Sequence, residues 1–293
     1  MILTGLFLSL TIALGSAQAL KVTYVDGTVE IQAANGWRPL DVGSAVAPDA
    51  RVRVSDSGTA EFTRGAKHFS IIKDGTYSIA DLLKGSAGAG QQGVGVSLAG
   101  KLHSVVSGTG QTSTAVGGAR GAAQGDNSQN LTWMDDQSSE TNATVLALLN
   151  KGRYHEAEVE IKKAMDDSQE DQQKQDLQYL LASAYYGEGE SARAYRTLLA
   201  MTDDPQSTYY PDSLILKAQI YVDNRSYSDG LTVLKPLLSG SSQAQYAQVG
   251  YLLAAMCYKG LGDNGSAKSA LSSGYALDPQ SDTAKQISKM QSE

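Results

Sequence analysis

Residues 251–279 read YLLAAMCYKGLGDNGSAKSALSSGYALDP, which is a helical stretch, a tight turn and a second helical stretch. Ala267, at the start of the second stretch, belongs to a series of small residues spaced 37, 36 and 37 apart: Ala157, Ala194, Gly230 and Ala267. The same arrangement surrounds each of them. A fixed period of this size predicts a solenoid of helix pairs, because no single pair can bury its own apolar face.

The last copy also carries a specific residue pattern. Its key positions are Tyr251, Ala255, Tyr258, Gly262, Ala267, Leu271, Gly274 and Pro279. With these residues at these offsets, the copy resembles a tetratricopeptide repeat. The resemblance implies a protein-binding α-solenoid over residues 141–293, in which Ser281-Asp282 starts a terminal capping helix.

The resemblance further implies which side chains face a partner. In such stacks the fifth, ninth and twelfth positions of each first helix point into the concave groove. Here they are Tyr179, Ser183, Tyr186, Ile215, Gln219, Val222, Leu252, Met256 and Lys259. This set is mainly apolar and aromatic, so we expect a partner segment with bulky apolar anchors. The alternative is that these residues pack against the next repeat or the N-terminal half.

The N-terminal half has a different periodicity. Short alternating runs of Val, Ile, Phe and Tyr cover residues 21–83 and predict β-strands. Four segments interrupt them and predict tight turns: Asp26-Gly27, Asn35-Gly36, Asp56-Ser57-Gly58 and Asp74-Gly75. The fold class is therefore α+β in separate domains, an all-β module (a small barrel, sandwich or β-roll) followed by the α-solenoid.

Several segments of this half carry a second resemblance: GTVEI at 27–31, GWRPL at 36–40, GSAV at 43–46, RVRV at 51–54, GTAEF at 58–62 and IIKDGTYSI at 71–79. Over residues 22–83 they look like a FecR-type domain, with 71–79 as its closing strands. Downstream, TSTAVGGARG at 112–121 is similar to a segment often found after such domains. The resemblance implies a cell-envelope location and a β module, but not sigma-factor regulation.

Composition divides the rest of the chain. Residues 84–125 contain 12 glycines; we interpret them as a Gly-rich continuation of the β module, with a flexible linker as the alternative. The predicted domains are thus a signal peptide at 1–19, the β module at 20–125, a polar junction at 126–140 and the repeats at 141–293. The sharp change in composition at the junction predicts that the two halves fold separately.

Residues 1–19 predict export. An apolar run from Ile2 to Leu14 precedes Ala17-Gln18-Ala19, which fits a signal-peptidase site. The alternative is an uncleaved membrane anchor; otherwise no stable membrane span is expected. Cys257 is the single cysteine, which excludes an internal disulfide. A large exported chain without disulfides fits the bacterial periplasm.

No catalytic, cofactor-binding or metal-binding group is predicted. The histidines His68, His103 and His155 lie in three segments, and we interpret them as surface or turn residues. Cys257 is expected to be a buried apolar residue rather than a nucleophile. A net charge of -7 and a pI near 5.0 argue against nucleic acid as a partner.

The sequence therefore indicates a non-enzymatic, exported periplasmic adaptor or scaffold that holds an envelope protein in its groove. One alternative is an envelope sensor whose FecR-like module binds a glycan or a receptor. Another, from a different class, is an enzyme with a cryptic site.

We expect the mature chain to begin at Leu20, because cleavage after Ala17-Gln18-Ala19 would remove the apolar run. Mass analysis of the exported protein measures this directly. A mass that includes Met1 would support the anchored form instead.

Overall fold

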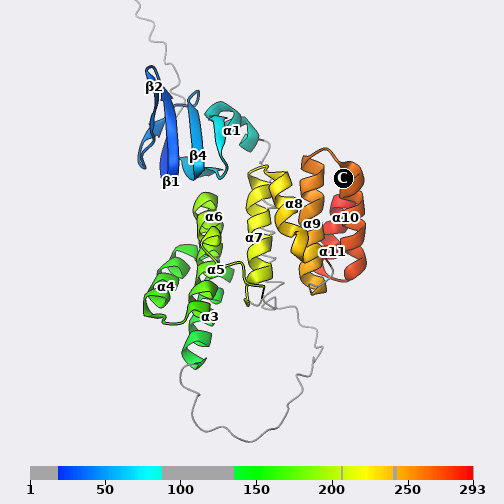
Figure 1. Ribbon diagram of the computed structural model, residues 1–293. Coiled ribbons are helices and arrows are strands. Elements are labelled where there is room, and N and C mark those ends of the chain that lie inside the picture. Colours follow the sequence, from blue (N-terminus) through cyan, green and yellow to red (C-terminus); the bar gives the residue numbers. More distant parts are fainter. Residues whose placement is uncertain (1–18, 88–134, 206, 240–242, 293) are drawn as a thin grey trace, which may run out of the picture.

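The computed structural model describes residues 19–87, 135–205, 207–239 and 243–292. An N-terminal antiparallel sheet is followed by a C-terminal stack of helix pairs (Figure 1). This confirms the predicted order of an all-β module and an α-solenoid. Residues 1–18 of the predicted signal peptide, residues 88–125 of the Gly-rich continuation and His103 lie outside the described residues.

The sheet is built on two long paired strands. Its elements are β1 (Leu20–Ala33), β2 (Gly36–Pro39), β3 (Ala45–Val46), β4 (Arg51–Arg64), β5 (Lys67–Ile71) and β6 (Gly75–Ser78). The order is β2-β1-β4-β5, while β3 pairs with β1 and β6 pairs with β4, all antiparallel. Each long strand thus has different partners along its two halves.

Two of the four predicted turns are wrong. Asp26-Gly27 lies inside β1 and Asp56-Ser57-Gly58 lies inside β4. Residues 27, 56 and 57 do have positive φ, but they form irregularities that bend continuous strands instead of reversing the chain. A Cβ on Gly27 would lie 2.8 Å from Gly58 Cα, so the two backbones approach each other closely at this bend. Asn35-Gly36 and Asp74-Gly75 do fall at chain reversals.

A separate irregularity in β1, between Val22 and Tyr24, decides which side chains face the core. Leu20 and Val22 face the core before it, whereas Val25, Val29 and Ile31 face the core after it, so the inward positions change from even to odd. A one-residue shift in a strand moves its side chains to the opposite face. The module is closed by helix α1 (Ile79–Ala87), where strand-like structure was predicted up to residue 83.

Nine helices of the described residues form the solenoid. They are α3 (Asp135–Asn150), α4 (Tyr154–Asp167), α5 (Asp171–Gly187), α6 (Ser191–Leu199), α7 (Tyr210–Asp223), α8 (Tyr227–Leu238), α9 (Ala244–Gly260), α10 (Asn264–Leu277) and α11 (Asp282–Gln291). α3 begins at Asp135, inside the segment predicted as a junction, so the repeats start earlier than residue 141. The predicted cap is present, because the Ser281 hydroxyl accepts a hydrogen bond of 2.9 Å from Ala284 N.

Each pair is joined by the same turn. One residue of each turn has positive φ: Gly152 (70°), Gly189 (86°), Arg225 (59°) and Gly262 (80°). The next residue donates its N–H to a carbonyl five positions back: Arg153 to Leu148 (3.0 Å), Glu190 to Tyr185 (2.8 Å), Ser226 to Tyr221 (2.8 Å) and Asp263 to Tyr258 (2.9 Å). This is the Schellman ending of a helix.

The small residues that define the period occupy one structural position. Ala157, Ala194, Gly230 and Ala267 are each the fourth residue of a second helix, and all four are buried. A Cβ on Gly230 would lie 3.5 Å from Tyr221 Cβ on the paired helix α7, and 2.9 Å from Cys257 Sγ on α9 of the next pair. The predicted register of the repeats therefore matches the structure, and small residues stand where paired helices come closest.

The stack is less regular between its second and third pairs. Among the first helices, α3 packs against α5 and α7 packs against α9, whereas the second pair meets the third mainly through α6 and α7. Residues 200–209 connect these two helices. We call this contact between the pairs α5–α6 and α7–α8 the seam.

We expect Ala267→Leu to destabilise the chain by about 1–3 kcal/mol, because the added methylenes would overpack α10 against α9. Ala267 is 2% exposed. Ala276→Leu is the matched control, since Ala276 lies on the exposed side of the same helix. Denaturant titration of both variants measures the effect; equal stabilities would contradict the assigned close approach.

Candidate protein-binding surface

The nine predicted groove residues lie on α5, α7 and α9, three on each helix, but they differ in exposure. Five are at most 7% exposed: Tyr179, Tyr186, Ile215, Gln219 and Leu252. Three are partly exposed, and Lys259 is exposed. The accessible part of the predicted surface is therefore Ser183, Val222, Met256 and Lys259, which we call the groove strip.

The buried tyrosines connect neighbouring repeats. Tyr186 Oη donates a 2.6 Å hydrogen bond to Asp223 Oδ2, and Gln219 Nε2 donates to Asp223 Oδ1 at 3.0 Å. The Tyr179 ring stacks on the Tyr209 ring with centroids 4.7 Å apart. These contacts join α5 to α7 and its preceding loop, across the seam. These buried side chains therefore pack against the next repeat, as the alternative interpretation of the predicted groove residues expects.

A buried carboxyl group lies further along the same inner side. Asp212, near the start of α7, accepts a 3.1 Å hydrogen bond from the hydroxyl of Tyr246 on α9. Burial raises the pKa of Asp212 to about 7, although the hydrogen bond from Tyr246 favours its charged form. Asp212 thus ties the third repeat to the fourth in the same way that Asp223 ties it to the second.

The β module packs on the solenoid through the outward face of β4. Ala60 and Phe62 point into the β core, so Thr59 and Glu61 point the other way, and all four are buried. In Figure 1, α6 lies directly beneath the sheet. Glu61 Oε1 accepts a 2.7 Å hydrogen bond from the backbone N–H of Ala192, in the first turn of α6.

Glu61 is in an unusual environment for a carboxyl group. It is 1% exposed, and its Oε2 has no hydrogen-bond partner within the described parts of the chain. The pKa of Glu61 is raised to about 8: burial is the main cause and the Glu190 carboxylate adds to it, while the Ala192 N–H and Arg193 oppose the rise. A carboxyl group with this pKa is mainly protonated at neutral pH, which avoids a buried charge.

Arg193 of α6 stands between the two halves. Its guanidinium lies 5.3 Å from the ring centroid of Tyr24 in β1 and 5.0 Å from that of Tyr185 in α5. Its Nη1 is 2.7 Å from Glu190 Oε2. One cation thus interacts with an aromatic face on each side of the interface, which is a favourable arrangement for a partly buried arginine.

Polar contacts at the rim involve two repeats. Arg196 of α6 pairs with Asp26, Lys73 Nζ lies 2.6 Å from Asp229 Oδ2 of α8, and Ser70 Oγ donates to Asn224 Oδ1 at 3.0 Å. Arg196 belongs to the second pair, whereas Asp229 and Asn224 belong to the third. The β module therefore bridges the seam from outside, at the edge formed by the turns within the pairs.

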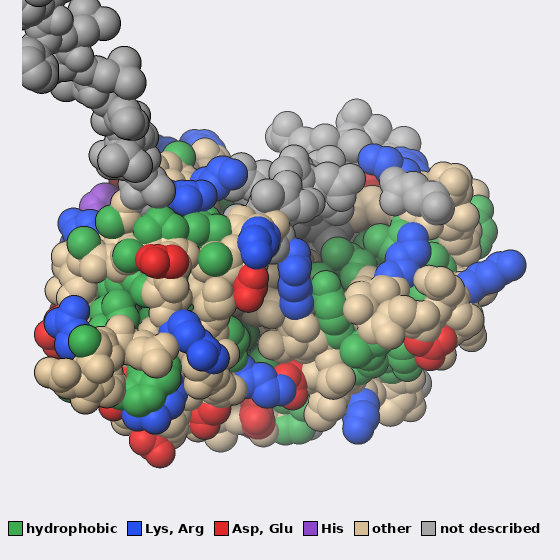
Figure 2. All heavy atoms as spheres, turned by 90° about the horizontal axis from the view of Figure 1, so that it is seen from above, with side chains coloured by type: hydrophobic (Ala, Val, Ile, Leu, Met, Phe, Trp, Pro, Cys, Tyr) green, Lys and Arg blue, Asp and Glu red, His purple; other side chains and the backbone are tan. Residues whose placement is uncertain are grey.

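The face seen from above the β module shows no large field of one charge. In Figure 2, Lys and Arg side chains are interspersed with Asp and Glu side chains, with hydrophobic side chains between them.

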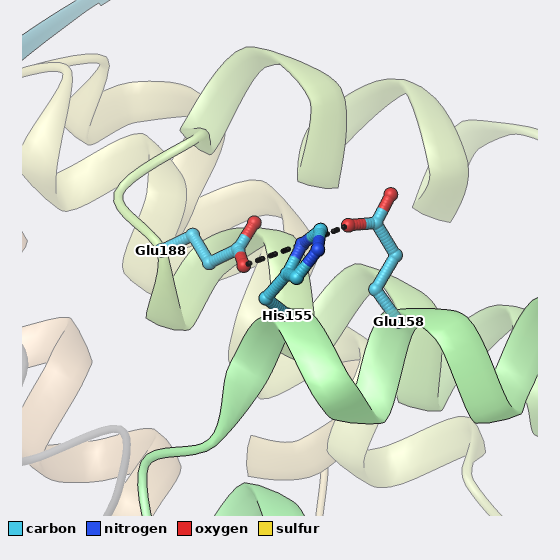
Figure 3. A group of neighbouring side chains, drawn as sticks. All are labelled: His155, Glu158 and Glu188. Atoms are coloured by element: carbon cyan, nitrogen blue, oxygen red, sulfur yellow. Dashed lines mark ion pairs between the residues drawn. The ribbon is translucent and has the colours of Figure 1, made fainter.

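One cluster of possible metal ligands was missed in the sequence. His155 Nδ1 lies 3.4 Å from Glu158 Oε2 and 3.9 Å from Glu188 Oε1, and Figure 3 shows the imidazole between the two carboxylates. Burial and the carboxylates of Glu190 and Glu158 raise the pKa of Glu188. The His155–Glu158 spacing of three was visible in the sequence, but Glu188 is brought near only by the fold.

The remaining reactive groups lie apart. His68 is on β5, against the turn at Gly189. Burial raises the pKa of the Cys257 thiol to about 12, so at neutral pH this group carries almost no thiolate, the form that acts as a nucleophile. Cys257 is buried, as predicted.

Comparison with known proteins supports the repeat assignment. The family described as anaphase-promoting complex, cyclosome, subunit 3, a family of tetratricopeptide-like repeats, matches residues 150–237, which extend from the end of α3 into α8. The match supports tetratricopeptide-like repeats in the helical half, over residues 150–237. No curated protein matches the chain. The FecR-type resemblance of the β module stays a prediction.

Repeats of this kind bind other proteins and are typically non-catalytic. Over the described residues, no helix combines the length and apolar character needed to cross a membrane.

We expect Glu61→Gln to remove a pH-dependent part of the stability. Between the ordinary pKa of 4.5 and about 8, folded Glu61 holds a proton that the unfolded chain has lost. The unfolding free energy of the wild type should therefore fall with rising pH in this window, by at most about 1.4 kcal/mol per pH unit. The variant keeps an acceptor for Ala192 N–H but cannot ionise.

The measurement is denaturant titration of both proteins from about pH 5 to pH 8. The difference in unfolding free energy, wild type minus variant, should decrease across the range. Glu160→Gln, at an exposed position of α4, is the matched control and should give a constant difference. A constant difference for Glu61→Gln as well would mean that Glu61 is charged in the folded chain.

Proposed function

We propose that this chain is an exported periplasmic adaptor or scaffold that holds an envelope protein in the concave groove of its repeats. The observation that carries the proposal is the stack of four helix pairs with one register, in which the first helices pack together in two sets, α3 with α5 and α7 with α9. Stacks of this kind offer an extended surface for a protein segment. Export and the periplasmic location are supported by the pattern of residues 1–19.

The groove strip indicates the chemistry of the partner. Val222 and Met256 supply partly exposed apolar surface on α7 and α9, and Ser183 lies on α5. Lys259 adds a cation at the far end, where its Nζ lies 3.3 Å from the Met290 carbonyl of α11. An extended or helical segment with bulky apolar anchors fits this surface. The buried groove residues hold the helices in position for it.

The docked β module supports a scaffold role. Its contacts with α6, α8 and the turn before α8 involve the second and third repeats, so it restrains the seam beneath the groove strip. A restrained groove loses less conformational freedom on binding, which favours affinity.

The same interface favours a second candidate, the envelope sensor. A glycan or receptor that binds the β module would act on Tyr24 and Glu61, which contact Arg193 and Ala192 of α6. The two candidates are separated by a glycan array probed with the whole chain: binding that Val222→Lys leaves unchanged would favour the sensor.

The adaptor proposal predicts that Val222→Lys combined with Met256→Lys abolishes partner capture from an envelope extract. Each substitution places a charge where an apolar anchor would be desolvated, which typically costs several kcal/mol of binding energy. Val222 lies in the last turn of α7, where a cation is compatible with the helix dipole. Val222→Lys alone should therefore keep the melting temperature close to that of the wild type, and it accompanies the double variant because Met256 packs in part against the core.

Val159→Lys is the matched control, because Val159 is 54% exposed on α4, a second helix outside the groove. The protein recovered in stoichiometric amount with the wild type should also be recovered with this control. Recovery that survives the double substitution would exclude the groove strip and direct the search to the β half.

A further inference from the structure

We propose that His155, Glu158 and Glu188 form a binding site for a divalent transition-metal ion of the zinc type, which joins α4 to the turn between α5 and α6. The inference concerns the first and second repeats and is independent of the proposed adaptor function. It rests on the geometry of three ligand atoms that come from two separate elements.

Local structure brings the three side chains together. His155 and Glu158 are one helical turn apart at the start of α4, so they lie on one face of the helix. Glu188 follows the last residue of α5 and starts the turn that Gly189 continues. Tyr154 holds the two elements in contact, because its ring occupies the space that a Cβ on Gly187 would need.

The distances between ligand atoms suit a tetrahedral ion. With zinc–ligand bonds of about 2.0–2.1 Å, ligand atoms at tetrahedral angles are separated by about 3.3–3.4 Å. Nδ1 of His155 is 3.4 Å from Glu158 Oε2 and 3.9 Å from Glu188 Oε1, and the three atoms lie within 4.8 Å of one another. Small side-chain rotations would complete the geometry, and the solvent side leaves a fourth position for water.

The ligand types select the class of metal. An imidazole nitrogen with two carboxylate oxygens suits zinc and neighbouring transition ions, whereas Ca²⁺ and Mg²⁺ prefer oxygen ligands only. Two carboxylates and one neutral imidazole supply the two negative charges that balance a divalent ion.

Neighbouring cations leave the required oxygen atoms available. Lys162 Nζ binds Glu158 through Oε1 at 2.7 Å, which fixes the carboxylate and leaves Oε2 directed at His155. Arg193 pairs with Glu190 at 2.7 Å, and its charge also acts on Glu158 and Glu188 from a distance. Lys162 therefore orients a ligand from outside, in the manner of the hydrogen bonds that commonly surround bound metals.

Titration of the full chain, purified without a histidine tag, with Zn²⁺ by calorimetry tests the proposal. We expect one ion per chain, with affinity lowered at least tenfold by His155→Ala and by Glu188→Gln. The matched control, Glu160→Gln on an exposed part of α4, should bind as the wild type does.

Cobalt provides an independent readout, because four-coordinate Co²⁺ absorbs visible light far more strongly than six-coordinate Co²⁺. The wild type should show the four-coordinate spectrum and His155→Ala should not. Zn²⁺ should also raise the melting temperature of the wild type and leave that of His155→Ala unchanged.

Three results would overturn the proposal: absence of Zn²⁺ binding to the wild type, Zn²⁺ binding that persists in both ligand variants, or equal affinity for Mg²⁺ and Zn²⁺.

Discussion

The close approach of the two helices in each pair is the constraint on which the solenoid depends. It demands a small residue at one position of every second helix, and Ala157, Ala194, Gly230 and Ala267 meet that demand. Once the backbones are this close, the turn between them must be short and repeat the same hydrogen bond. Arg225 adopts a conformation that elsewhere requires glycine, so the turn geometry is imposed by the pairing of the helices as well as by local preference.

The sequence predicted the parts of the fold that depend on local pattern. The register of the repeats, the cap at Ser281 and the burial of Cys257 follow from spacing and residue type, and all three are present. The turns at Asp26-Gly27 and Asp56-Ser57-Gly58 were wrong because positive φ serves a strand bend as well as a chain reversal. The backbone preference is identical in the two cases, and only the pairing of β1 with β4 distinguishes them.

Contacts between distant segments could not be predicted. Glu61 sits in an alternating strand where a polar residue normally faces water, and nothing local indicates that α6 covers it. The offsets predicted three positions on each of α5, α7 and α9, but they do not distinguish a side chain that faces a groove from one that fills the space between repeats. Tyr186 shows the difference: its partner Asp223 belongs to the next repeat.

The bridge across the seam has a mechanical consequence. A solenoid behaves as a spring, because each pair contacts only its neighbours and small rotations at every joint add up along its axis. In this chain one joint is braced from outside by the β module through Lys73 and Ser70 on one side of the seam and Asp26 and Glu61 on the other. Bending is then confined to the contacts between the first and second pairs and between the third and fourth pairs, while the second and third pairs keep a fixed relative orientation.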